Sequence, residues 1–245
     1  MAESLEQAWE LNQKGRNNVI IGGNLWLKMG NRNILNAIDL STLGLDRIEE
    51  DESGFRIGCM ATLRDIEMHE GLNKEFQNLF KEAVRHIVGV QFRNCATVGG
   101  SIFPKLGFSD VLTAFLACDT QVILYKKGEV SLREFIYMPL DNDILTHIYV
   151  KKDGRKTAYE SFRMTETDFP TLTCAMAMVD GRFETVLGAR PKHAEVVIDE
   201  ELADSLSKED VASYAKRVID KLQYGSNIRG SKQYRKQLSK VLISR

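Results

Sequence analysis

This sequence of 245 residues lacks the features that would place it in several common classes of protein. Lys and Arg (33) nearly balance Asp and Glu (34), so no strong field attracts nucleic acid or an anionic membrane. No apolar run approaches the roughly 18 residues of a membrane-spanning helix. Residues 1–6 hold neither a basic nor an apolar stretch, so we expect no signal peptide and a cytoplasmic location.

Metal-binding and dinucleotide motifs are also missing. The four cysteines form no Cys-x-x-Cys pair, and the four histidines show no ligand spacing. We therefore expect reduced, scattered cysteines and no iron–sulfur or zinc site built by this chain alone. The glycines form no Gly-x-Gly-x-x-Gly motif, which argues against a Rossmann site.

Two glycine pairs are the most informative feature that is present. Gly22-Gly23 follows the apolar run Val19-Ile20-Ile21, and Gly99-Gly100 lies between Thr97-Val98 and Ser101. A glycine pair lets the backbone approach a ligand closely and offer several N–H groups to it. Either pair alone is more typical of a turn or a strand bend. Together they predict one large phosphorylated cofactor.

The pattern of apolar residues predicts alternating short helices and strands. We expect helices over 4–13, 72–88 and 111–117, and strands over 19–21, 34–39, 54–59, 120–125 and 144–150. Residues 151–156 are polar and turn-forming, so we place a boundary there. Three strands over 157–162, 172–179 and 183–187, then helices over 207–222 and 233–243, predict a small α+β domain.

Four groups of residues carry a resemblance to a known family: Val19–Leu27, Gln91–Ile102 with Ser109-Asp110-Val111-Leu112, Glu129–Ile148, and Arg163 with Asp168-Phe169-Pro170 and Gly188-Ala189-Arg190-Pro191. Gln91–Ile102 is the most specific of these, because the pattern runs in order over twelve residues. In these residues the chain resembles the FAD-binding (medium) subunit of molybdenum hydroxylases, the relatives of xanthine dehydrogenase, carbon monoxide dehydrogenase and nicotinate dehydrogenase.

The resemblance implies an α+β fold. Residues 1–153 would be a two-subdomain FAD-binding module of the vanillyl-alcohol-oxidase/molybdopterin-dehydrogenase type, with subdomains of about 1–52 and 53–153. Residues 154–245 would be a small C-terminal domain with a three-stranded sheet and helices. The chain would pass electrons between a [2Fe–2S] small subunit and NAD(P), ferredoxin or another acceptor, next to a molybdopterin-binding large subunit.

The resemblance also implies a set of FAD-binding residues, with no catalytic side chain and no metal ligand in this chain. One side of the cradle would be Ile20, Ile21, Gly22, Gly23, Asn24, Leu25 and Trp26, and the other Thr97, Gly99, Gly100 and Ser101. Asp110 matches a flavin-site aspartate, and Ile87 and Leu145 match positions that line the flavin. Asn24, Leu25 and Ser101 replace the family's usual Thr, Asp and Asn, which keeps the backbone donors but changes the side chains.

Several readings of single residues stay open. Asp110 is also suited to cap the helix over 111–117. Arg93 is either a surface residue or a brace of the glycine loop or of a subunit interface. Trp26 is expected in the core rather than stacked on the flavin. Two other functions compete with the flavoprotein: a flavin-free assembly subunit, which the altered loop residues favour, and a stand-alone flavin oxidase.

Overall fold

The computed structural model describes residues 1–199 and 207–245. The chain begins with a small unit in which an amphipathic helix packs on a two-stranded parallel sheet. Ser4 caps the helix by accepting a hydrogen bond from the Gln7 N–H. The elements of this unit are α1 (Leu5–Gln13), β1 (Asn18–Ile21), the 3-10 turn η1 (Leu27–Met29) and β2 (Asn36–Asp39).

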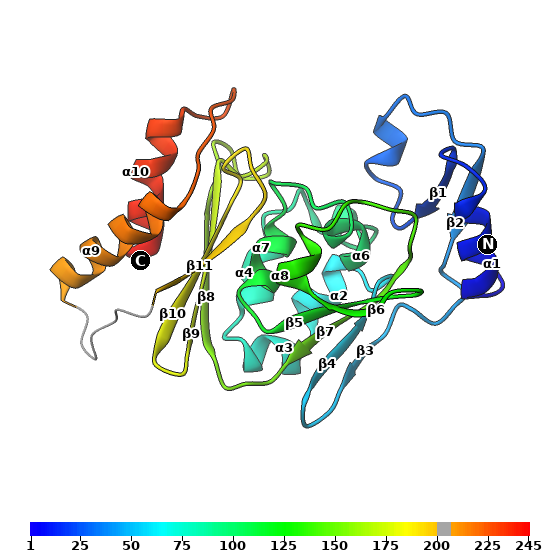
Figure 1. The fold of residues 1–245 in the computed structure, drawn as a ribbon, viewed down its shortest axis with the longest axis horizontal. Coiled ribbons are helices and arrows are strands. Elements are labelled where there is room, and N and C mark those ends of the chain that lie inside the picture. Colours follow the sequence, from blue (N-terminus) through cyan, green and yellow to red (C-terminus); the bar gives the residue numbers. More distant parts are fainter. Residues whose placement is uncertain (200–206) are drawn as a thin grey trace.

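The middle of the chain forms an antiparallel five-stranded sheet in the order β3-β4-β7-β5-β6. Short helices gather between this sheet and the C-terminal part of the chain (Figure 1). The strands are β3 (Ile48–Glu50), β4 (Gly54–Gly58), β5 (Thr120–Leu124), β6 (Gly128–Ser131) and β7 (Leu145–Lys151). The helices are α2 (Leu63–Met68), α3 (Glu70–Glu75), α4 (Leu79–Val84), α5 (Val90–Arg93), α6 (Val98–Ile102), α7 (Asp110–Leu116) and α8 (Leu132–Phe135).

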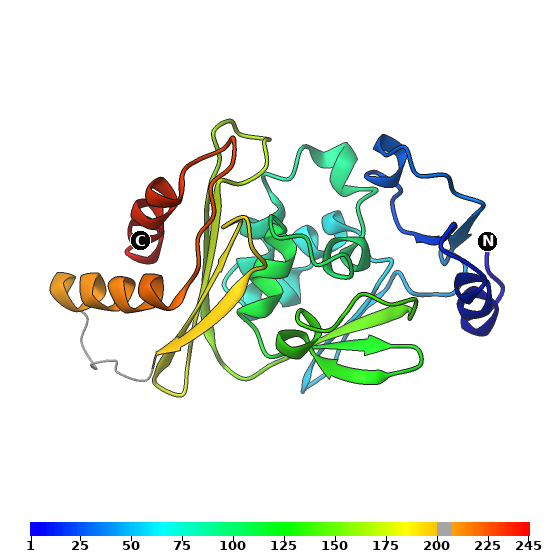
Figure 2. The same ribbon diagram turned by 45° about the horizontal axis from the view of Figure 1, so that its top comes forward.

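The C-terminal sheet has four strands, so the prediction of three was wrong. The predicted strands are β8 (Lys156–Phe162), β9 (Leu172–Val179) and β10 (Arg182–Gly188). The additional strand, β11 (Glu195–Asp199), pairs antiparallel with β10 at the edge of the sheet. Its signal is weak because the strand is only five residues long, has no apolar–polar alternation and begins soon after the bend at Pro191. Helices α9 (Lys208–Lys221) and α10 (Lys232–Ile243) cover the outer face of this sheet (Figure 2).

The long helix predicted over 72–88 is also absent, because it is broken between α3 and α4. Gln77 and Asn78 adopt left-handed backbone conformations with φ of 46° and 64°. Two such residues in succession end a right-handed helix. The Asn78 N–H donates to the Asn73 carbonyl at 2.7 Å, and α4 starts anew at Leu79.

Apolar side chains form two cores. The larger one lies between the central sheet and its helices, and includes Phe55, Phe76, Phe80 and Phe115. The smaller one lies between the C-terminal sheet and helices α9 and α10. Helix α7 is buried along its whole length and contacts β9 and β10, so it joins the two parts. The division of the chain after residue 153, which falls between β7 and β8, stays a prediction.

Among residues 1–199 and 207–245, no helix combines the length and the apolar composition needed to cross a membrane.

Candidate cofactor cavity

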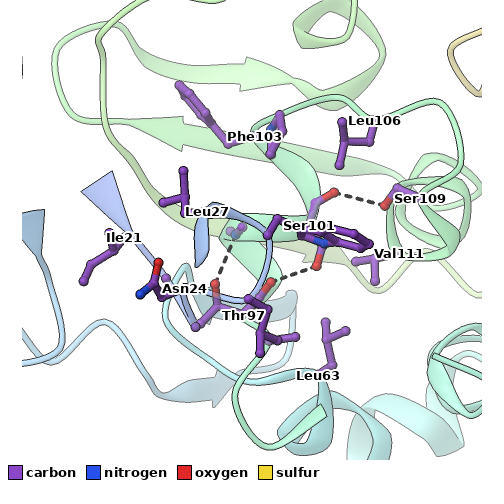
Figure 3. Close-up of a pocket in the computed structure, with 18 of the residues that line it drawn as sticks. Ile21, Asn24, Leu27, Leu63, Thr97, Ser101, Phe103, Leu106, Ser109 and Val111 are labelled. Atoms are coloured by element: carbon purple, nitrogen blue, oxygen red, sulfur yellow. Dashed lines mark hydrogen bonds between the residues drawn. The ribbon is translucent and has the colours of Figure 1, made fainter. Parts of the chain in front are cut away.

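One cavity of about 910 Å³ lies where the N-terminal unit, the helices of the middle part and the β8–β9 connection meet. Every residue that the sequence predicted for the cofactor lines it. They are Ile20, Ile21, Gly22, Gly23, Asn24, Leu25, Trp26, Ile87, Thr97, Gly99, Gly100, Ser101, Asp110 and Leu145. Figure 3 shows Ile21 and Asn24 of the first glycine loop beside Thr97 and Ser101 of the second. That these residues bind FAD stays a proposal.

The two glycine loops pack directly against each other. A Cβ on Gly23 would lie 1.8 Å from the Cys95 carbonyl oxygen, and one on Gly22 would lie 2.4 Å from Thr97 Oγ1. A Cβ on Gly99 would meet Cys59 at 2.7 Å. These three glycines are therefore required for loop packing, independently of any ligand. Gly100 differs, because it is exposed and a Cβ there would meet only Thr97 Oγ1, at 3.0 Å.

The second loop has already used its N–H groups inside the protein. The Val98 N–H donates to the Ala61 carbonyl and the Gly99 N–H to the Cys59 carbonyl, at 2.8 and 2.9 Å. Thr97 Oγ1 caps α6 by accepting from the Gly100 N–H at 3.1 Å. This loop therefore shapes the cavity by packing, whereas the sequence pattern had suggested that its amides face a ligand.

The first loop has open amides. Within the described parts of the chain, the N–H groups of Gly23, Asn24 and Leu25 have no hydrogen-bond acceptor. Asn24 has a positive φ of 56°. Successive N–H groups around a left-handed residue form a concave surface that favours an anion. This loop is therefore the better candidate for holding a phosphate.

Asp110 lines the cavity, but both of its carboxylate oxygens have partners from β8 and from the residue that follows it. Arg163 Nη2 lies 2.7 Å from Oδ2, and the Tyr159 hydroxyl donates to Oδ1 at 2.5 Å. Burial raises the pKa of Asp110, against the Arg163 guanidinium, which stabilises the carboxylate. Ser109, not Asp110, caps α7 by accepting from the Leu112 N–H. Asp110 thus ties α7 to β8 at the cavity wall.

Arg93 is not a surface residue, and it ties α5 to α2 and to the segment after α4. Its side chain is buried and forms a double contact with Glu67, with Nε–Oε2 at 2.8 Å and Nη2–Oε1 at 3.1 Å. Its Nη1 donates to the carbonyls of Arg85 and Ile87. The Arg93 guanidinium therefore fixes the backbone of Ile87, which was predicted to line the cavity. Arg93 itself lies just before the second glycine loop in the sequence.

Trp26 is not in the core, so that prediction was wrong. The residue is 45% exposed and belongs to an aromatic cluster at the cavity wall. It stacks on Phe169 with ring centroids 5.3 Å apart, and meets Phe92 and Phe108 edge-on at 6.5 and 6.1 Å. The sequence singled out the segment of Phe169, but it gave no signal that Phe92, Phe108 and Phe169 would surround Trp26.

Comparison with known proteins identifies relatives over the whole chain. A family model described as the FAD binding domain in molybdopterin dehydrogenase matches residues 1–150. The glyceraldehyde dehydrogenase medium chain of Sulfolobus acidocaldarius is 26% identical in an alignment of 264 positions that covers 98% of this chain and 93% of that protein.

Solved structures share the fold. Quinoline 2-oxidoreductase from Pseudomonas putida 86 matches with a TM-score of 0.87 and 17% identity, over 99% of this chain and 92% of that one. Carbon monoxide dehydrogenase from Hydrogenophaga pseudoflava, in a form that lacks the Mo-pyranopterin moiety, matches with a TM-score of 0.85 and 22% identity, over 99% and 93%.

Proposed function

The chain belongs to the family of FAD-binding domains of molybdopterin dehydrogenases, and from this premise we propose that it transfers electrons through FAD bound in the cavity, between a [2Fe–2S] partner and NAD(P) or another acceptor. The match covers residues 1–150 of 245 and includes both glycine loops. The chain is thus an FAD-binding medium subunit of the molybdenum hydroxylase type of dehydrogenase.

The observation that carries the proposal is the pairing of open amides with an open glycine in one cavity. Gly23, Asn24 and Leu25 offer N–H groups on one side, and Gly100 leaves space on the other. A volume of about 910 Å³ lies within the range of sites that enclose large cofactors. The residues present therefore fit a dinucleotide with a pyrophosphate group.

Each part of the cavity suits a different part of the cofactor. We assign the pyrophosphate to the loop amides of residues 23–25, because these donors have no acceptor within the described chain. The apolar side chains of Ile87 and Leu145 suit an aromatic ring system. When bound, FAD supplies the redox chemistry, and this chain binds and orients it. No side chain of the cavity is required as a nucleophile or as a general base.

The partners are proposed from the relatives. One relative is named a medium chain, which indicates a complex of several chains, and the family is named for molybdopterin dehydrogenases. We propose a [2Fe–2S] small subunit and a molybdopterin-binding large subunit as the partners of this chain. The large subunit would oxidise its substrate at a CH or CH2 group of that substrate, as in xanthine dehydrogenase-like enzymes.

A flavin-free assembly subunit is the second candidate, and two observations favour it. The amides of the second loop are already paired with the protein, and both oxygens of Asp110 have protein partners. Only the first loop then remains to bind phosphate, and its Asn24 and Leu25 depart from the family's usual residues.

An absorbance spectrum of the purified chain separates the two candidates. We expect the near-ultraviolet and blue bands of an oxidised flavin, and release of FAD, identified by mass, on denaturation. A colourless protein that binds no added FAD would contradict the flavoprotein and support the assembly subunit. Co-purification of the native complex, with metal and iron–sulfur analysis, then tests the proposed partners.

A further inference from the structure

The loop between α9 and α10 contacts the wall of the cavity. This loop lies at the same end of the C-terminal sheet as the β8–β9 connection, which lines the cavity (Figures 1 and 2). Arg235 of α10 is fully buried and fixes both segments. Its guanidinium donates to the Thr171 carbonyl at 2.9 Å, to the Gly225 carbonyl at 3.1 Å and to Asn227 Oδ1 at 2.6 Å.

The fixed loop presents Arg229 to the cavity wall. Arg229 binds Asp168 with both ends of its guanidinium, with Nη2–Oδ1 at 2.8 Å and Nε–Oδ2 at 3.2 Å. Its Cζ also lies 4.9 Å from the ring centroid of Phe169. Asp168 Oδ1 in turn accepts the Phe169 N–H at 2.7 Å. One side chain thus restrains both the backbone and the ring of Phe169.

Phe169 passes this restraint to the first glycine loop. Its ring stacks on Trp26, which follows the open amides of residues 23–25. Phe108 meets the Phe169 ring edge-on at 4.5 Å. The helix and strands of the N-terminal unit pack chiefly against one another, so this stack is one of the contacts that place the loop relative to the rest of the cavity.

We propose that Arg229 is a positioning residue: through Asp168 and Phe169 it holds Trp26, and with it the phosphate-binding loop, at the cavity. Arg229 itself does not line the cavity. The consequence for FAD affinity rests on the proposed function. The placement of Trp26 by Arg229 is independent of the proposed function, because this placement follows from contacts within the chain.

Two measurements test the proposal, both on the full-length chain. In the first, FAD is titrated into apoprotein of wild type, Arg229→Ala and Arg229→Lys. We expect Arg229→Ala to weaken FAD binding about three- to tenfold, since an ion pair and a cation–π contact are lost. Arg229→Lys keeps the charge and should recover part of the affinity. Lys232→Ala removes a neighbouring exposed cation and should bind FAD like wild type.

In the second measurement, Trp26 emission is recorded in a Trp9→Phe background, which leaves Trp26 as the remaining tryptophan. Arg229→Ala should shift this emission to the red, because the ring loses its stacked neighbour and gains water. In the FAD titration, the double variant Arg229→Ala, Phe169→Ala should bind FAD as tightly as Phe169→Ala alone, since Arg229 acts through Phe169.

The outcomes separate this proposal from the proposed function. If wild type binds FAD, an unchanged affinity in Arg229→Ala overturns the positioning role. If wild type binds no FAD, the flavoprotein proposal fails, and the emission of Trp26 alone decides whether Arg229 positions it. Thermal unfolding of each variant shows whether an effect reflects a general loss of stability instead, which would also overturn the proposal.

Discussion

The glycines of the two loops have different physical reasons for being glycine. Gly22, Gly23 and Gly99 have no room for a Cβ, because protein atoms lie within 2.7 Å of that position. Gly100 has room on all sides except toward Thr97 Oγ1 at 3.0 Å. The sequence pattern treats all four as approach points for a ligand. The structure separates three packing glycines from one that keeps the cavity open.

This difference predicts opposite outcomes for two neighbouring substitutions. Gly100→Val should remain folded but lose FAD, because its side chain fills the cavity. Gly99→Val should lose about 1–3 kcal/mol of unfolding free energy through overpacking against Cys59. Urea unfolding and the FAD content of each purified variant check both. Stoichiometric FAD in Gly100→Val would show that the cofactor lies elsewhere.

A second residue-scale prediction concerns the buried pair of Glu67 and Arg93. Burial raises the pKa of Glu67, but hydrogen bonds and charge from Arg93 and Arg64 outweigh burial and hold that pKa below its usual range. The pair therefore stabilises the fold fully above the unfolded pKa of about 4.3, and this contribution is lost as the pH falls toward the lower folded value.

Glu67→Gln should lower the unfolding free energy at pH 7 by about 1–3 kcal/mol, since a charged hydrogen-bond partner of Arg93 is replaced by a neutral one. The difference from wild type should shrink as urea unfolding is repeated at pH values below the unfolded pKa of about 4.3, because Glu67 takes up its proton first in the unfolded chain. The exposed Glu52→Gln serves as control. A difference that stays constant with pH would show that Glu67 does not titrate as described.

At the scale of elements, the sequence predicts what local signals determine. Ser4, Thr62 and Ser109 are hydroxyl residues of the kind favoured at helix N-termini, and each caps the helix that follows it. The bounds of β1, β4, β5 and β7 lie within one residue of the strands predicted from the apolar pattern. The break at Gln77 and Asn78 was missed because neither residue is a glycine or a proline. It depends on tertiary contacts, including the Thr157 N–H that donates to Gln77 Oε1 at 2.6 Å.

The break between α3 and α4 gives a prediction at this scale. Asn78 has a φ of 64° and its side chain makes no capping hydrogen bond. Asn78→Ala should lower the unfolding free energy by about 1 kcal/mol, because alanine tolerates the left-handed region less well than asparagine. Asn78→Gly should be neutral or stabilising. Urea unfolding of the pair checks the prediction, and it is wrong if alanine and glycine behave alike.

At the scale of the whole molecule, the cavity joins segments that are far apart in the sequence. The glycine loops and the residues Ile87, Asp110 and Leu145 could be placed there from the family resemblance, because motif positions are local. The aromatic cluster around Trp26 could not, since Phe92, Phe108 and Phe169 meet only in the folded chain. The sequence also could not predict that the second loop's amides are hydrogen-bonded within the protein, because their acceptors Cys59 and Ala61 lie on another segment.

Hydrogen exchange tests which loop holds the cofactor. In the apoprotein, the amides of Gly23, Asn24 and Leu25 should exchange rapidly because they have no acceptor among the described residues, whereas those of Val98 and Gly99 should already be protected. FAD at 100 times its Kd should slow exchange of residues 23–25 by up to about 100-fold, since exchange then requires release of the ligand. Amides of β9 and β10 that pair within the C-terminal sheet serve as internal controls. If FAD instead protected only residues 98–101, the second loop would have to open its internal hydrogen bonds to bind the phosphate, and the assignment of the two loops would be reversed.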